Sequence, residues 1–246
     1  MPKIATRLFV EDPVTEGSPL GLDSGRAHFL RSVLRLSPGA HVAVFNGTDG
    51  EWLARIDGLG KGWASVLPIE RLRAAETEPD LWLLFAPVKR ARIDFLAEKA
   101  TELGCARLQP VMTARTAVER VNLQRLAANA REAAEQCQRL TVPEVKEPVS
   151  LAELLDIWPR GRRILMADEG GDAPPIHDVL VAEKEQLQEP WALLTGPEGG
   201  FAEEERANLS RLPFVRRASL GPRILRADTA VVAGLAILQA LAGDWR

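Results

Sequence analysis

The pattern of apolar residues changes once along this chain, and that change most constrains the fold. Before residue 74, short apolar stretches alternate with turns, which is typical of β-strands. After residue 80, apolar runs of strand length are followed by segments with apolar residues at helical spacing. Residues 74–80 are acidic and contain a proline, as linkers often do. The sequence therefore predicts two domains, residues 1–73 and 80–246.

The first predicted domain is a small β-barrel with one helix. The helix is expected from Gly25 to Leu36, with Asp23 or Ser24 as its N-cap. The turn 46–50 joins two strands of a predicted hairpin. The predicted strands are Arg7–Val10, His41–Phe45, Glu51–Ile56 and Trp63–Ile69.

The second predicted domain belongs to the α/β class. Its strands are expected at Leu81–Ala86, Arg107–Val111, Ile164–Ala167, Trp191–Leu194 and Ala218–Leu220. Its helices are expected at Lys89–Leu103, Leu123–Leu140, Ala202–Leu212 and Thr229–Leu241. Such alternation indicates a parallel sheet with helices on both faces. The last helix is apolar almost all round, so it belongs either to the core or to a subunit interface.

Composition excludes several classes of protein. With 46% hydrophobic residues among 246, a disordered chain is not expected. The chain contains no run of about 18 apolar residues, and its first residues lack the apolar core of a signal peptide. Cys105 and Cys137 form no CxxC pair, so we expect reduced thiols in the cytoplasm. The three histidines have no metal-ligand spacing, and no metal is expected.

The net charge of −3 argues against a nucleic-acid partner only as an average. Residues 89–139 carry ten Lys or Arg against six Asp or Glu, whereas residues 140–246 carry twelve against seventeen. Most of the cations are arginines, whose planar fork suits phosphate. RNA binding and a solvated, salt-bridged surface both fit this distribution.

A glycine-rich turn at Thr195–Gly200 follows an apolar strand and precedes an acid-rich helix. In open α/β sheets, ligands bind at such turns. The turn matches neither GxGxxG nor the P-loop, and three glutamates at the helix start would repel a phosphate. A cofactor without phosphates is predicted, the alternative being a purely structural turn.

A second loop, residues 219–230 (SLGPRILRADTA), also joins a strand to a helix. Its apolar residues and backbone groups could form one wall of a ligand-binding site, with Arg223 and Arg226 beside that wall. The alternative is that the two arginines pair with nearby acids.

These two loops resemble the signature loops of the RsmE family, the 16S rRNA uridine-N3 methyltransferases of the SPOUT superfamily. The similarity extends over nearly the whole chain. Further matching stretches are EKATELG (98–104), REAAEQCQR (131–139), VPE (142–144), HFLRSVLR (28–35) and FNG (45–47). Asn46 stands where the family more often has Asp, and little effect is expected because both suit a turn.

The resemblance implies an N-terminal PUA-like RNA-binding barrel and a C-terminal domain with a deep trefoil knot. It also implies a homodimer and S-adenosylmethionine as cofactor, bound at the knot. The implied cofactor-binding residues are Met166, Ala167, Thr195, Gly196, Glu198, Gly199, Gly200, Leu220, Gly221, Ile224 and Leu225.

The implied reaction methylates N3 of one uridine in 16S rRNA, either naked or in the assembled 30S subunit. Uracil N3 must lose its proton, so the enzyme must stabilise the resulting anion. Arg226 or Arg223 is expected to do so, and Glu198 is the candidate base unless it only accepts loop N–H groups. Two alternatives stay open, a SPOUT methyltransferase acting on another RNA and a catalytically inactive assembly factor.

The RNA-contacting residues expected on this basis are cations of the first half of the chain. His28, Arg31 and Arg35 would share one helix face unless that face forms salt bridges within the barrel. The full set is Arg7, His28, Arg31, Arg35, Lys89 and Arg92.

Overall fold

A computed structural model of the chain describes residues 2–245, apart from the side chains at positions 90 and 91. By their contacts the residues form two compact units. Unit 1 comprises Met1–Thr77 with Ala134–Val142, and unit 2 comprises Glu78–Ala133 with Pro143–Arg246. Residues 134–142, which the sequence pattern placed in the second domain, therefore group with unit 1.

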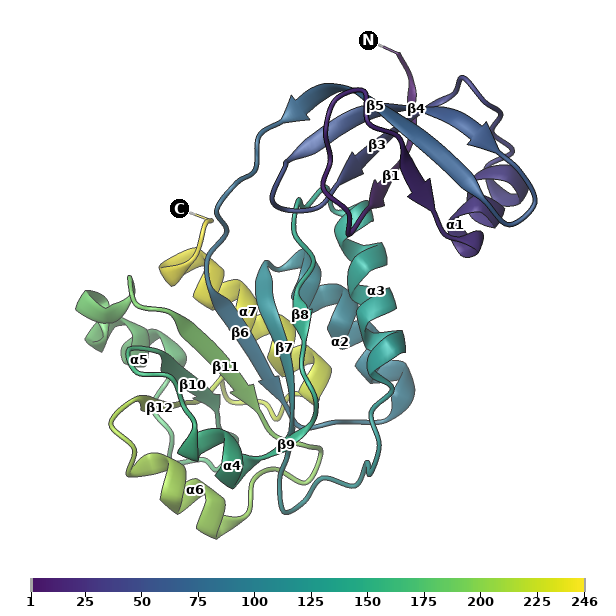
Figure 1. The fold of residues 1–246 in the computed structure, drawn as a ribbon. Coiled ribbons are helices and arrows are strands. Elements are labelled where there is room, and N and C mark those ends of the chain that lie inside the picture. Colours follow the sequence, from purple (N-terminus) through teal and green to yellow (C-terminus); the bar gives the residue numbers. More distant parts are fainter. Residues whose placement is uncertain (1, 246) are drawn as a thin grey trace. The chain divides into compact units, whose positions relative to one another are not determined.

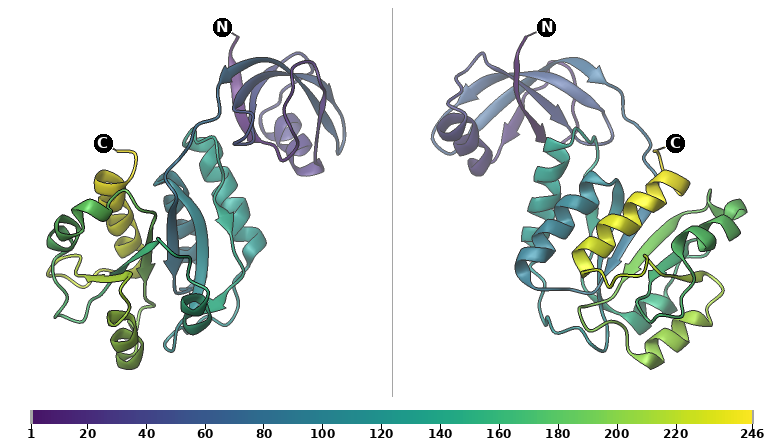
Figure 2. Two further views of the ribbon diagram at one scale, coloured as in Figure 1. Left: turned by 60° about the vertical axis from the view of Figure 1, so that its left-hand side comes forward. Right: turned by 180° about the vertical axis from the view of Figure 1, so that it is seen from behind.

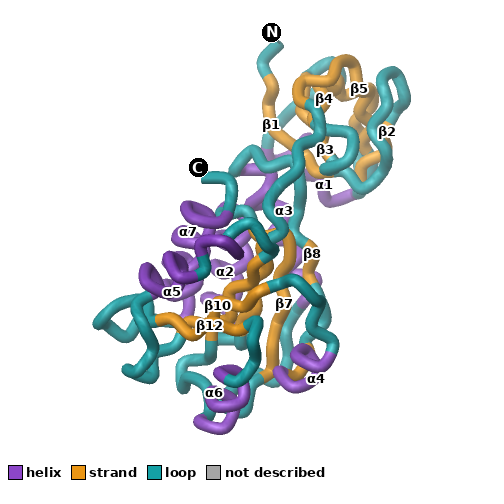
Figure 3. Tube along the Cα trace, turned by 90° about the vertical axis from the view of Figure 1, so that its left-hand side faces the viewer, coloured by secondary structure: helices purple, strands orange, loops and turns teal. Residues whose placement is uncertain are grey.

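Unit 1 is built on a five-stranded sheet with the order β1-β3-β4-β5-β2 (Figure 1 and Figure 3). Strand β1 runs parallel to β3, and the other neighbours are antiparallel. The alternating apolar residues of these strands pack with Ala27 and Leu30 in one core. The strands are β1 (Ile4–Phe9), β2 (Leu20–Leu22), β3 (His41–Phe45), β4 (Glu51–Leu59) and β5 (Ala64–Arg73). The predicted strands are present, and β2 was not predicted.

The predicted helix from Gly25 to Leu36 was wrong in its form. Helix α1 (Ser24–His28) starts at Asp23, whose carboxylate accepts the N–H of Arg26, and then widens into the π-helical turn η1 (Phe29–Val33). Arg35 has a φ of 55°, and the N–H of Leu36 bonds back to the carbonyl of Leu30. A residue in the left-handed conformation commonly ends a helix. Arg35 therefore lies outside the helix.

Unit 2 contains a parallel sheet with the order β12-β10-β11-β6-β7-β8, and β9 pairs with β7 (Figure 1). The strands are β6 (Leu81–Phe85), β7 (Cys105–Met112), β8 (Glu144–Val145), β9 (Val149–Ser150), β10 (Arg163–Ala167), β11 (Trp191–Thr195) and β12 (Val215–Ala218). The helices are α2 (Arg90–Glu102), α3 (Leu123–Gln136, whose last residues lie in unit 1), α4 (Leu151–Asp156), α5 (Ile176–Ala182), α6 (Glu203–Ser210) and α7 (Ala227–Ala242).

Helices cover both faces of the sheet, as predicted. Leu194 and its same-face neighbours pack with Leu154 of α4 and Leu209 of α6. Leu193 points to the opposite face, where a Cβ on Gly234 of α7 would lie only 2.8 Å from it. Helices α2 and α7 lie side by side on that face (Figure 2, right). Strands β8 and β9, helices α4 and α5, and the 3-10 turn η2 (Lys184–Gln186) were not predicted.

Strand order does not define how the chain threads between strands, so the trefoil knot stays a prediction. None of the helices within residues 2–245 is both long and apolar enough to cross a membrane.

Candidate active site

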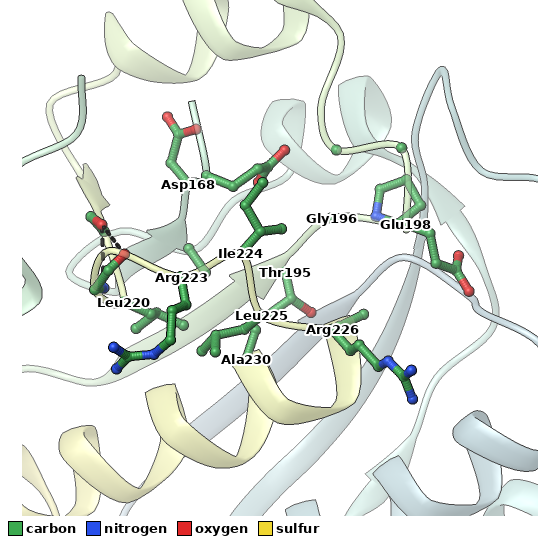
Figure 4. A pocket seen from close by; sticks show the side chains of 18 of the residues that line it. Asp168, Thr195, Gly196, Glu198, Leu220, Arg223, Ile224, Leu225, Arg226 and Ala230 are labelled. Carbon is green, nitrogen blue, oxygen red and sulfur yellow. Dashed lines mark hydrogen bonds between the residues drawn. The ribbon is translucent and has the colours of Figure 1, made fainter. Parts of the chain in front are cut away.

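A cavity of about 430 Å³ opens at the carboxyl ends of three neighbouring parallel strands of unit 2 (Figure 4). Its walls are the loops that follow Ala167 of β10, Thr195 of β11 and Ala218 of β12. Since the carboxyl ends of parallel strands meet at one edge, three segments distant in sequence converge there. The cavity has the size of a site for one small molecule.

The glycine turn after β11 leaves no room for a side chain at two of its glycines. A Cβ on Gly196 would lie 3.0 Å from the ring of Phe201, which is fully buried. Gly200 has a φ of 66°, and a Cβ there would lie 1.9 Å from Glu169 Oε1. Its N–H donates to the carbonyl of Pro197 at 2.9 Å. These positions need glycine because the backbone itself forms the wall.

The loop after β12 supplies apolar surface and backbone donors. Gly221 has a φ of 112°, and its N–H donates to Ser219 Oγ. Ile224 is 84% exposed, although it lines the cavity. Within residues 2–245, the backbone N–H groups of Leu220 and Leu225 donate no hydrogen bond. These two N–H groups are therefore available as hydrogen-bond donors to a ligand.

The loop after β10 is fixed by the buried carboxylate of Asp168. Arg217 donates to it at 2.6 Å, Arg206 lies 3.7 Å away, and the N–H of Gly170 donates at 2.9 Å. Arg217 also bonds Asp172, and this bond holds the pKa of that exposed carboxyl below its usual range. The pKa of Arg217 is raised, chiefly by the same bond. The network holds one cavity wall in place.

Charged side chains surround the opening of the cavity. Arg92 lies 3.5 Å from Glu198 and 4.0 Å from Asp228. Arg223 and Arg226 are exposed and form no ion pair within the part of the chain that the structure describes. They extend toward opposite ends of the cavity, with Glu198 at the end of Arg226 (Figure 4). These two cations are available to an anionic ligand.

The donor set of this cavity suits S-adenosylmethionine. Apolar side chains and unpaired backbone N–H groups match a nucleoside, and the acidic start of α6 does not suit a phosphate. Among residues 2–245, no three His, Cys, Asp or Glu side chains cluster so as to hold a metal ion.

The cavity brings together nearly all residues predicted for cofactor and catalysis. Arg226, Arg223 and Glu198 line it, as do the predicted cofactor residues from Ala167 to Leu225. Met166 is the exception. Its side chain points to the sheet face that α4 and α6 cover, and it is fully buried there beside Leu194. Sequence reasoning missed Asp168, although a polar residue directly after an apolar strand is a recognisable signal.

The residues predicted to contact RNA fall into three groups. Arg7 donates to Glu51 at 2.5 Å and to the carbonyls of Ala134, Glu135 and Arg139 at 2.9 Å each, so its guanidinium is occupied within unit 1. Arg92 lines the cavity. The exposed residues are His28, Arg31, Arg35 and Lys89.

The alternative that His28, Arg31 and Arg35 form salt bridges within the barrel is not observed. Across residues 2–245, His28, Arg31 and Arg35 form no ion pair with a carboxylate. Their charges are therefore exposed to solvent.

Two family models match the chain. The model described as an RNA methyltransferase domain matches residues 76–239, and the model described as an RNA methyltransferase PUA domain matches residues 22–67. Ribosomal RNA small subunit methyltransferase E of Rickettsia conorii is 31% identical over 236 residues, which are 96% of this chain and 95% of that protein. The same enzyme of Synechocystis is 30% identical over 243 residues, 97% of this chain and 78% of that protein.

Solved structures agree with these matches. The crystal structure of a ribosomal RNA small subunit methyltransferase E from Neisseria gonorrhoeae, bound to S-adenosyl methionine, superposes with a TM-score of 0.86. It is 27% identical, and the alignment covers 98% of this chain and 99% of that one.

Proposed function

This chain belongs to the family of ribosomal RNA small subunit methyltransferase E, and we propose from that premise that it methylates N3 of one uridine in 16S rRNA. It is an S-adenosylmethionine-dependent RNA methyltransferase. The observation that carries the proposal is the convergence of the two signature loops and the loop after β10 on one cavity. The substrate is the rRNA itself or the assembled 30S subunit.

The reaction is a single in-line displacement. The cofactor's sulfonium supplies the methyl group, the N3–C bond forms as the S–C bond breaks, and S-adenosylhomocysteine leaves. The N3 proton must pass to a base, and the negative charge on uracil spreads onto its two carbonyl oxygens. The protein has to hold the base, accept the proton and stabilise the charge.

Arg226 and Glu198 fit these roles best, because they lie together at one end of the cavity (Figure 4). Arg226 has no carboxylate partner within residues 2–245, so its charge is available to the uracil oxygens. In the described structure, Glu198 accepts no backbone N–H and has Arg92 as its one hydrogen-bond and ion-pair partner, which leaves a carboxylate oxygen for the proton. Arg223, at the opposite end, is the second candidate for charge stabilisation.

The two domains predicted from the sequence divide the work in this proposal. Residues 1–73 bind RNA through the exposed charges of His28, Arg31 and Arg35, and residues 80–246 form the knotted methyltransferase domain, with Lys89 and Arg92 near its start. Arg7 is left out of the RNA surface because its hydrogen bonds are internal. A homodimer acting in the cytoplasm completes the proposal.

Calorimetry with S-adenosylmethionine tests the cofactor site. We expect saturable binding, whereas no binding at high micromolar cofactor would favour an inactive RNA-binding factor. Mass mapping of 16S rRNA from a deletion strain tests the target. Persistence of the N3-methyluridine would instead favour methylation of another RNA.

A further inference from the structure

We propose that Arg115 is a positioning residue that holds the glycine turn in its cofactor-binding form. This inference rests on the proposed function, because it concerns the same cavity. Arg115 does not line the cavity, and nothing in the sequence pattern assigned it a role. It lies in the loop that follows β7.

The loop carrying Arg115 is itself rigid. The N–H of Thr113 donates to Thr116 Oγ1 at 3.0 Å, and the two hydroxyl groups lie 2.9 Å apart. The N–H of Thr116 donates back to the carbonyl of Thr113 at 3.1 Å. Side-chain hydrogen bonds of this kind fix a tight turn. The backbone that carries Arg115 is therefore held in one conformation.

The side chain of Arg115 contacts the side of the glycine turn that faces away from the cavity. Its Nη1 donates to the carbonyl of Gly199 at 2.8 Å. A Cβ built on Gly199 would lie 3.6 Å from both Cβ and Cδ of Arg115, so the arginine stem lies along this glycine. The interaction combines a charge-assisted hydrogen bond with van der Waals contact.

A second set of hydrogen bonds connects the other end of segment 199–202 to the same loop. The N–H of Ala114 donates to Glu205 Oε1 at 2.7 Å, while Glu205 Oε2 accepts the N–H of Ala202 at 2.9 Å. The carboxylate thus joins the loop after β7 to the start of α6. Residues 199–202 are held at both ends by one neighbouring loop.

The bond to the Gly199 carbonyl acts on the cavity through peptide geometry. The Gly199 carbonyl and the Gly200 N–H belong to one planar peptide group, so fixing the carbonyl fixes the N–H. Glycines on both sides of this peptide offer little resistance to its rotation. Together with the bond from the Gly200 N–H to the Pro197 carbonyl, the bond from Arg115 restrains this peptide at both ends, so the turn is preorganised before the cofactor arrives.

The test compares Arg115→Met with Arg115→Lys and with a matched control, Arg120→Met. Methionine keeps most of the stem and removes the hydrogen bond, whereas lysine can still donate. Arg120 is an exposed arginine of the same loop with no ion pair within the described residues. The measurements are the Kd and KM for S-adenosylmethionine, kcat, and RNA affinity as a function of salt.

We expect Arg115→Met to raise the Kd and KM for S-adenosylmethionine about tenfold, the size of one charge-assisted hydrogen bond. At saturating cofactor kcat stays within twofold, because bound cofactor restores the turn. Arg115→Lys regains most of the affinity, and Arg120→Met matches wild type.

The inference is overturned if cofactor affinity stays within twofold while RNA binding weakens and its salt slope falls by about one, because Arg115 would then be a phosphate contact. A wild-type protein that binds no S-adenosylmethionine would overturn the proposed function instead.

Discussion

Replacing Arg7 by methionine separates a structural role from an RNA-binding role. The guanidinium forms an ion pair with Glu51, and the two side chains are only 14% and 9% exposed. It also donates to three carbonyls of residues 134–139. Methionine fills similar space and supplies no donor, so the change removes polar interactions and keeps packing.

The expected loss in the free energy of unfolding is about 4 kcal/mol. Breaking one side of a buried ion pair costs about 3–5 kcal/mol because the remaining charge stays desolvated. Arg73 lies 3.7 Å from Glu51 and offsets part of that cost. The three carbonyls add about 1 kcal/mol, since solvent can reach them in part. The sum is a large share of the stability of a small domain.

Urea unfolding, with hydrogen exchange of β1 and β3 to localise the change in unit 1, measures this loss. Arg31→Met is the control, because Arg31 is exposed and has no ion pair within residues 2–245. It should unfold within about 0.5 kcal/mol of wild type. The reasoning is refuted if Arg7→Met is equally stable and its RNA affinity falls.

Four further predictions concern the turn at Asn46, the glycine turn and the end of the cavity where Arg226 lies. Asn46 donates to Asp49 Oδ2 at 2.6 Å, so Asn46→Asp should lower the free energy of unfolding by about 2 kcal/mol in urea titration at pH 7. The bond from Asn46 and a second bond from the N–H of Val14 hold the pKa of Asp49 below its usual range. Their contribution to the free energy of unfolding is therefore present above about pH 4 and is lost as the pH falls further. Unfolding measured as a function of acid pH should show this loss. Gly200→Ala should weaken S-adenosylmethionine binding about tenfold in calorimetry, because a Cβ at that φ is strained and displaces Glu169. Arg226→Ala should abolish turnover with cofactor binding largely kept; normal turnover in a methyl-transfer assay would remove Arg226 from the mechanism.

Local sequence signals predicted the cavity well because each wall is a strand followed directly by its loop. The glycine turn and the loop with Arg223 and Arg226 could be recognised separately, and the parallel sheet then brings them together. Met166 shows that a position at the end of a strand is not enough to predict a cavity residue. Side chains alternate between the two faces of a sheet, and that of Met166 lies on the face covered by α4 and α6.

Residues whose roles depend on distant partners could not be predicted from their neighbours. Arg7 and Arg92 both read as exposed cations, yet one bonds carbonyls more than 120 positions away and the other lies beside Glu198. The partners of Asn46 likewise decide its effect, since Asp49 needs a donor that aspartate lacks. The π-helical turn within the predicted helix 25–36 could not be predicted from the spacing of apolar residues, because Ala27 and Leu30 are buried as they would be in a regular helix.

The central claim is that this chain transfers a methyl group from S-adenosylmethionine to N3 of one uridine. The most direct measurement incubates the purified protein with methyl-labelled S-adenosylmethionine and unmethylated 16S rRNA or 30S subunits, followed by mass mapping of the RNA. The account predicts one labelled N3-methyluridine per 16S rRNA on at least one of the two substrates. Label on another atom or nucleotide, or no label on either substrate with cofactor bound, would contradict it.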